Sequence, residues 1–145
     1  MREISSDEVR KLRECLIALA NHHNKVSVNF KGCYPKVPIE QTIEHFAVDL
    51  KDGRSCVAVI ENDDTVIGFC KINIDNTIGV LEYLVVLDDY RGLGYGALLI
   101  EWALSRFARQ GIHDIDVKVA DGNEAVSLYE KYGFKMNAHI LRLSR

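Results

Sequence analysis

The residues best suited to chemistry lie in one glycine-rich segment, Arg91-Gly-Leu-Gly-Tyr-Gly96. An apolar stretch typical of a strand leads into it, and a stretch typical of a helix follows at once. A turn needs one glycine, whereas three at alternate positions leave the backbone N–H groups uncovered for a ligand. The positive end of the helix dipole adds to these donors, so the segment predicts an anion site, most often for phosphate.

A P-loop for a nucleoside triphosphate is excluded by the residues after the last glycine. That loop ends in Gly-Lys-Ser/Thr, where the Lys binds phosphate and the hydroxyl binds magnesium. Here Ala97 and Leu98 follow Gly96, and neither can take those roles.

A Rossmann dinucleotide site fits part of the pattern and remains the less favoured alternative. Gly92, Gly94 and Ala97 match G-x-G-x-x-G/A, and Asp114 or Asp116 lies near the spacing of a ribose-binding acid. However, residues 88–91 separate the strand from the first glycine, and both aspartates begin their strand rather than end it. Only one βαβ unit fits in the chain.

The elements around the segment predict an α+β domain covering residues 1–145. A capping box at residues 5–8 and helical apolar spacing predict a first helix that frays near residues 21–24. An irregular segment at 25–38 follows. Further helices are predicted at 39–50, 95–110 and 124–132, and strands at 55–61, 65–74, 78–86, 113–119 and 134–143. Tight turns make the first three strands antiparallel, and the βαβ unit makes the third and fourth parallel.

Composition narrows the class of protein and of partner. No apolar run among the 145 residues approaches a membrane span, and the polar N-terminus does not resemble a signal peptide. A net charge of −3 argues against nucleic acid as the main partner. The four cysteines form no C-x-x-C pair, which predicts buried, reduced thiols in a cytoplasmic protein. They are Cys15, Cys33, Cys56 and Cys70.

Two segments together resemble a known family. The first is Arg91-x-x-Gly94-x-Gly96-Ala97 after a strand, and the second is Asn123-Glu-Ala-Val-Ser-Leu-Tyr-Glu-Lys-Tyr-Gly-Phe134. They look like the signature and the "N…A…LYEKxGF" helix of the GNAT superfamily of acyl-CoA-dependent N-acetyltransferases, and the order of the elements agrees. The resemblance implies a mixed β-sheet flanked by helices, with an antiparallel meander and a parallel, splayed central pair of strands.

The resemblance also implies acetyl-CoA as cosubstrate, with no metal. The pyrophosphate would lie on the glycine loop and the pantetheine chain along the preceding strand. The cofactor-binding residues carried over in this way are Leu84, Val85, Val86, Arg91, Gly92, Leu93, Gly94, Tyr95, Gly96, Ala97, Asn123 and Tyr129.

Two side chains are the catalytic candidates. The resemblance selects Tyr129 over Tyr132 as the acid beside the thioester sulfur, although an aromatic residue on a short helix is more often part of the core. Glu82 lies on the strand before the loop and is the candidate base for the amine. Exposure on the solvent face of that strand is the plainer explanation of its charge.

The acceptor is expected to be the primary amine of a small molecule or peptide, in a chain compatible with a homodimer. Polar residues around the irregular segment are the substrate candidates: His22, His23, Asn24, Asn29 and Tyr34. The two histidines equally fit a solvated helix end, and no third ligand is spaced to make a zinc site with them. A non-catalytic acyl-CoA-binding or regulatory module of the same fold is the alternative from another class.

Overall fold

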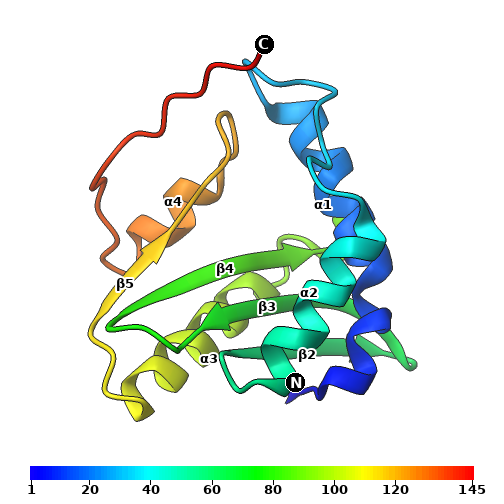
Figure 1. Cartoon of the computed structure of the whole chain (residues 1–145), viewed down its shortest axis with the longest axis vertical. Coiled ribbons are helices and arrows are strands. Elements are labelled where there is room, and N and C mark those ends of the chain that lie inside the picture. Colours follow the sequence, from blue (N-terminus) through cyan, green and yellow to red (C-terminus); the bar gives the residue numbers. More distant parts are fainter.

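One five-stranded sheet, in the order β1-β2-β3-β4-β5, organises the chain (Figure 1). A computed structural model describes all of residues 1–145. The strands are β1 (Arg2–Glu3), β2 (Ser55–Asn62), β3 (Thr65–Asn73), β4 (Ile78–Val86) and β5 (Asp114–Val117). The first four pair antiparallel and β4 pairs with β5 in parallel, which confirms the predicted mixed sheet.

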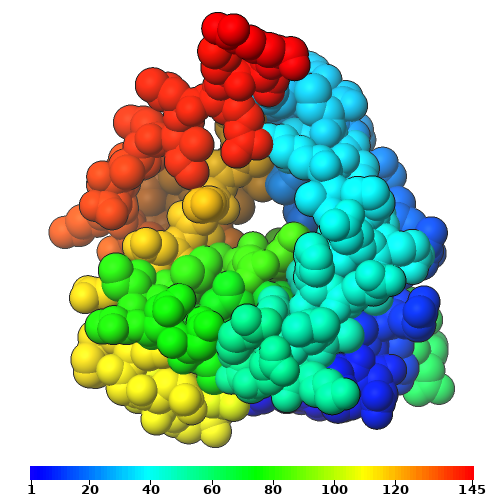
Figure 2. All heavy atoms as spheres, in the orientation of Figure 1, coloured from blue at the N-terminus to red at the C-terminus, as the bar shows by residue number.

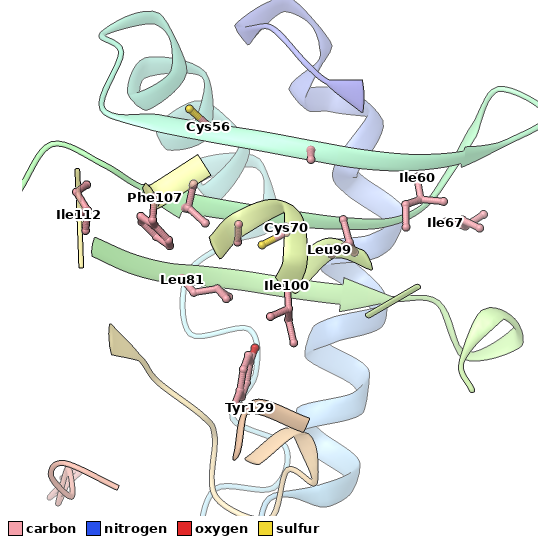
Figure 3. Packing of buried hydrophobic residues seen from close by; sticks show 13 residues of the cluster. Cys56, Ile60, Ile67, Cys70, Leu81, Leu99, Ile100, Phe107, Ile112 and Tyr129 are labelled. Atoms are coloured by element: carbon pink, nitrogen blue, oxygen red, sulfur yellow. The ribbon is translucent and has the colours of Figure 1, made fainter. Parts of the chain in front are cut away.

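Helices cover both faces of the sheet. On one face, α3 (Tyr95–Arg109) buries Leu99, Ile100, Ala103 and Phe107, whose helical spacing forms one apolar stripe (Figure 3). On the other face lie a 3₁₀ helix (Ser6–Leu12), α1 (Arg13–Val26) and α2 (Ile39–Lys51), which bury a second apolar cluster. Each fully buried apolar side chain contributes about 1.5–3 kcal/mol to folding.

The parallel pair of strands separates part-way along its length. Residues 78–81 of β4 pair with β5, and the pairing ends at Leu81 and Val117. Beyond Leu81, β4 remains paired only with β3. The predicted splay is therefore confirmed, and residues 82–86 have one edge free of the ladder.

The first helix extends further than predicted. Residues 21–24 do not fray, and α1 continues to Val26. The reason lies in Asn24, whose side-chain amide donates to the Tyr34 carbonyl oxygen at 2.8 Å and accepts from the Tyr34 N–H at 2.9 Å. The loop thus satisfies the polar groups that suggested a solvated helix end.

The predicted last strand is absent. After the short helix α4 (Ala125–Glu130), residues 134–145 form neither helix nor strand. No backbone hydrogen bond joins residues 135–145 to the rest of the chain. Because no strand of the chain lies beside them, the alternating pattern that predicted a strand has nothing to pair with. The segment runs from α4 toward the connection between α1 and α2 (Figure 1).

Two predictions from composition have separate outcomes. Cys15, Cys56 and Cys70 are buried and free as predicted, but Cys33 is exposed, because it lies in the loop between α1 and α2. None of the helices has the length and hydropathy that a bilayer crossing requires.

Asp121 joins the loop after β5 to the end of α1. Its carboxylate accepts from Ser27 Oγ at 2.8 Å and from the N–H groups of Val28 and Asn29 at 2.7 and 2.8 Å. Gly122 follows with a φ of 77°, and a Cβ there would collide with the Val26 carbonyl oxygen. The two loops can therefore approach closely only with this Asp-Gly pair.

Replacing Asp121 by Asn should destabilise the fold in a pH-dependent way. Hydrogen bonds from Asn29 N–H and Ser27 lower the pKa of Asp121 below its ordinary value of 3.8. A lowered folded pKa gives stability that is present above the unfolded pKa and lost as pH falls through the folded one. Thermal melts should show the Asp121→Asn variant melting below wild type at pH 7, with the gap closing below about pH 3.8. Asp75→Asn in an exposed turn is the control, and a gap that stays constant down to pH 2 would contradict the carboxylate's role.

Candidate active site

The glycine loop exposes a row of backbone donors. Gly92 and Gly94 have φ values of 77° and 88°, a region that glycine enters without strain, and Gly94 is the N-cap of α3. The N–H groups of residues 92–97 donate to no other backbone group of the chain. Because they lie at the positive end of a 15-residue helix, they form an anion-binding surface.

A cavity of about 500 Å³ opens on this loop. Gly96 lies within the first turn of α3, where a Cβ would come to 3.4 Å from the Leu128 side chain of α4. Asn123 accepts from the Ala125 N–H at 3.0 Å and so begins α4 at the cavity wall. Ten of the twelve predicted cofactor residues line this cavity: Leu84, Val85, Val86, Arg91, Gly92, Gly94, Tyr95, Gly96, Ala97 and Asn123. We call it the glycine-loop cavity.

Leu93 and Tyr129 are the two predicted residues that do not line the glycine-loop cavity. The Leu93 side chain points outward, and the residue is 65% exposed. Tyr129 is buried in the core under α3, with its ring 5.6 Å from that of Phe134. Its hydroxyl points toward Leu81 and Ile100 (Figure 3). Burial raises the Tyr129 pKa, so the phenol stays protonated at neutral pH.

Arg91 holds the loop in place. Its Nε donates to the Val86 carbonyl oxygen at 3.1 Å, and one terminal nitrogen lies 3.2 Å from Asp88 and 3.2 Å from His22 Nδ1. Burial and the Arg91 charge lower the His22 pKa, which favours the neutral imidazole that can accept from Arg91. Arg91 thereby connects the end of β4, the loop and α1.

A second cavity, of about 320 Å³, lies on the other side of β4. It is enclosed by α1, α2 and the loop between them. Its polar side chains are His23, Tyr34, Lys36, His45, Asp49, Glu82 and Tyr83. Burial lowers the pKa of His23, so its imidazole is neutral at pH 7. We call it the acidic cavity, after Asp49 and Glu82.

Glu82 reaches the acidic cavity because β4 contains an irregularity. Lys71 of β3 pairs with Tyr83 and Ile72 with Leu81, so Glu82 is an extra residue in β4. A bulge of this kind re-aims the side chain. Leu81 faces α3, whereas Glu82 and Tyr83 both lie on the α1–α2 side.

A buried lysine supports the two carboxylates. Lys71 is fully buried, and its Nζ lies 2.8 Å from Glu82, 3.1 Å from Asp49 and 3.1 Å from Asn73 Oδ1. The same ammonium lies 4.9 Å from the centre of the Phe46 ring. One cation therefore fixes two carboxylates, and the Glu82 side chain keeps 31% of its surface exposed.

The predicted substrate residues divide between different places. His23 and Tyr34 line the acidic cavity, but His22 lines the glycine-loop cavity against Arg91. Asn24 pairs with the Tyr34 backbone, and Asn29 lines neither cavity. Lys71, Asp49 and His45 were missed. A single Lys inside the apolar strand 66–72 was the available signal, since an unpaired buried lysine is rare.

The two cavities meet along one strand. Glu82 and Tyr83 face the acidic cavity, residues 84–86 face the glycine-loop cavity, and Leu19 of α1 lines both. An anionic ligand and a cationic ligand can therefore bind on the two sides of β4. No group of three His, Cys, Asp or Glu side chains could hold a metal ion.

Comparison with known proteins agrees with this arrangement. The model of the acetyltransferase (GNAT) family matches residues 18–134. A [ribosomal protein bS18]-alanine N-acetyltransferase from Haemophilus influenzae is 33% identical over 78 residues, which are 52% of this chain and 51% of that protein. The chain thus matches about half the length of that relative.

Two solved structures share the fold. A predicted acetyltransferase with acetyl-CoA from Clostridium acetobutylicum has a TM-score of 0.78 at 17% identity, covering 99% of this chain and 94% of that one. An N-acetyltransferase in complex with coenzyme A from Thermoplasma acidophilum has a TM-score of 0.69 at 21% identity, covering 94% and 92%. With the family model matched over most of its length, and with its sheet, glycine loop and splayed strands, the chain belongs to the acetyltransferase (GNAT) family.

Proposed function

We propose that the chain transfers an acetyl group from acetyl-CoA to a primary amine by direct attack in a ternary complex. The observation that carries this proposal is the meeting of two cavities along β4, one rich in anion-binding N–H groups and the other lined by two carboxylates. Such an arrangement brings a thioester and an amine together from opposite sides of one strand. Proximity of this kind replaces a bimolecular step with an effectively unimolecular one.

The glycine-loop cavity is the proposed acetyl-CoA site. Its pyrophosphate would accept hydrogen bonds from the N–H groups of residues 92–97, Leu93 included, since a backbone donor needs no side chain in the cavity. The pantetheine amides would pair with the free edge of β4 at residues 84–86 as an added strand does. The two CoA complexes among the structural neighbours support this assignment.

The acidic cavity is the proposed acceptor site. An alkyl ammonium is attracted by Asp49 and Glu82, which share the single charge of Lys71. An amine with an ordinary pKa near 10 must lose a proton before it can attack. Glu82, directly or through a water molecule, takes that proton. The alanine acetyltransferase relative supports a peptide N-terminus as one candidate acceptor beside small-molecule amines.

The remaining steps follow from charge. The amine nitrogen bonds to the thioester carbonyl carbon, and the carbonyl oxygen becomes an oxyanion that a backbone N–H of residues 84–86 stabilises. The C–S bond then breaks, and the thiolate takes a proton from the Tyr129 hydroxyl, which its raised pKa keeps protonated until that point. The four free cysteines suit a reducing compartment, and we propose a cytoplasmic location.

Gly94→Glu should abolish the rise in melting temperature that CoA causes in wild type. The added carboxylate would repel the pyrophosphate at the N-terminus of α3. Gly111→Glu is a matched control, because Gly111 also has a positive φ and open space at its Cβ position but lies beyond the other end of α3. A CoA-induced shift that persists in Gly94→Glu would place the cofactor elsewhere.

Tyr129→Phe should lower kcat by about 10²–10⁴, the range for a lost general acid, with little change in the Kd of acetyl-CoA. Tyr132→Phe is the control, because Tyr132 lies on the same short stretch with its hydroxyl hydrogen-bonded to Glu101. Steady-state kinetics and CoA titration measure both quantities. An unchanged kcat in Tyr129→Phe would leave that residue as core alone.

Glu82→Gln should lower kcat by about 10²–10⁴, because the amine loses its base. Asp49→Asn removes the other carboxylate that accepts from Lys71 and should mainly raise the KM of the amine. Circular dichroism checks that both variants fold. Equal losses of kcat in the two variants would show that the effect acts through Lys71 and not through a base.

A further inference from the structure

The C-terminal segment, residues 134–145, has the pattern of a strand that is apolar on one side. Phe134, Met136, Ala138 and Ile140 alternate with Lys135, Asn137 and His139. A period of two places the apolar side chains on one face. In the structure this face has nothing to cover: Met136 is 69% exposed and Ile140 64%, and Leu141 and Leu143 beyond them are exposed still more.

The sheet has an edge that matches this pattern. β5 pairs with β4 on one side only, and its outer edge is unpaired. Ile115 and Val117 pack against the core under α3 but are only half-buried, whereas Asp114 and Asp116 are exposed. The edge therefore offers apolar side chains on one face and two negative charges on the other. An open edge of this kind is a template for an added strand.

The charges on the two elements are complementary. The polar face of the C-terminal segment carries Lys135 and His139, and β5 carries Asp114 and Asp116. If the segment added to the outer edge of β5 with its apolar face on the α3 side, Met136 and Ile140 would cover Ile115 and Val117. Lys135 and His139 would then lie on the face of the two aspartates.

Within one chain the segment does not reach that edge. It leaves α4 and extends away to the connection between α1 and α2, where the Arg142 charge acts on Tyr34 (Figure 1). Figure 2 shows an opening between the C-terminal segment and the body of the molecule. The segment and the edge that suits it are thus both unsatisfied in a single copy.

We propose that two copies of the chain exchange their C-terminal segments, each adding residues 134–140 as a strand to the outer edge of β5 in the other. The exchange is reciprocal, so both segments and both edges are satisfied by one twofold axis. It supplies the backbone partners that residues 135–140 lack in one chain and covers their apolar face. The proposal is independent of the acetyl-transfer proposal and survives its failure.

Sedimentation velocity on the full chain should show a dimer for wild type. A Met136→Asp/Ile140→Asp variant should be monomeric with an unchanged circular dichroism spectrum, because these side chains pack on nothing within the chain. Val48→Asp, which replaces a half-exposed apolar residue on α2, should remain a dimer. A monomeric wild type would overturn the proposal, and so would a Met136→Asp/Ile140→Asp variant that dimerises as wild type does.

A mixing experiment separates exchange from return of the segment onto its own β5. Asp114→Lys/Asp116→Lys makes the edge repel the segment, and Lys135→Glu/His139→Glu makes the segment repel the edge. Each variant alone should dissociate with a Kd at least about tenfold above wild type, since like charges then face each other in both copies. Mixed in equal amounts, they should form a heterodimer, because every edge then meets a segment of opposite charge. A mixture that stays monomeric would overturn the exchange.

Discussion

The separation of β4 from β5 is the constraint on which the site depends. The ladder ends at Leu81 and Val117, and backbone groups of residues 84–86 are left without partners on that edge. An unpaired edge inside a protein must find other hydrogen-bond partners, which makes it a ligand site. Asp121 maintains the opening, because its three hydrogen bonds hold the loop after β5 on the end of α1 and away from β4. The glycine loop lies where the opened strand ends, so anion and edge are presented together.

The bulge at Glu82 gives β4 its second role. By adding one residue opposite Lys71 and Ile72, it places Glu82 and Tyr83 on one face and returns residues 84–86 to their alternation. The buried Lys71 then has to be compensated, since an isolated charge in the core is strongly unfavourable. Asp49 and Glu82 supply that compensation from α2 and β4, and in doing so they are fixed at the cavity wall. A structural need of the core thus defines the electrostatics of the proposed acceptor site.

The sequence predicted what local patterns encode. The glycine spacing and the "LYEKxGF" helix identified the family and ten of the residues that line the glycine-loop cavity. Long-range features escaped it: the Asn24–Tyr34 pairing that extends α1, the Asp121 contacts, and the Lys71 cluster each join residues at least ten positions apart. His22 and His23 are neighbours in sequence but face different cavities, because adjacent helical residues point in different directions. The strand pattern at 134–143 was read correctly as a pattern, but its partner is not within the chain.

The claim at the centre of this account is that one strand brings acetyl-CoA and an amine together. Release of free CoA thiol from acetyl-CoA, measured on the full chain with a panel of primary amines including peptides with different N-terminal residues, tests it most directly. The account predicts saturable release that requires both substrates, with lines that intersect in double-reciprocal plots, as a ternary complex demands. Tight CoA binding without amine-dependent release for any amine would contradict it and would favour a non-catalytic acyl-CoA-binding module.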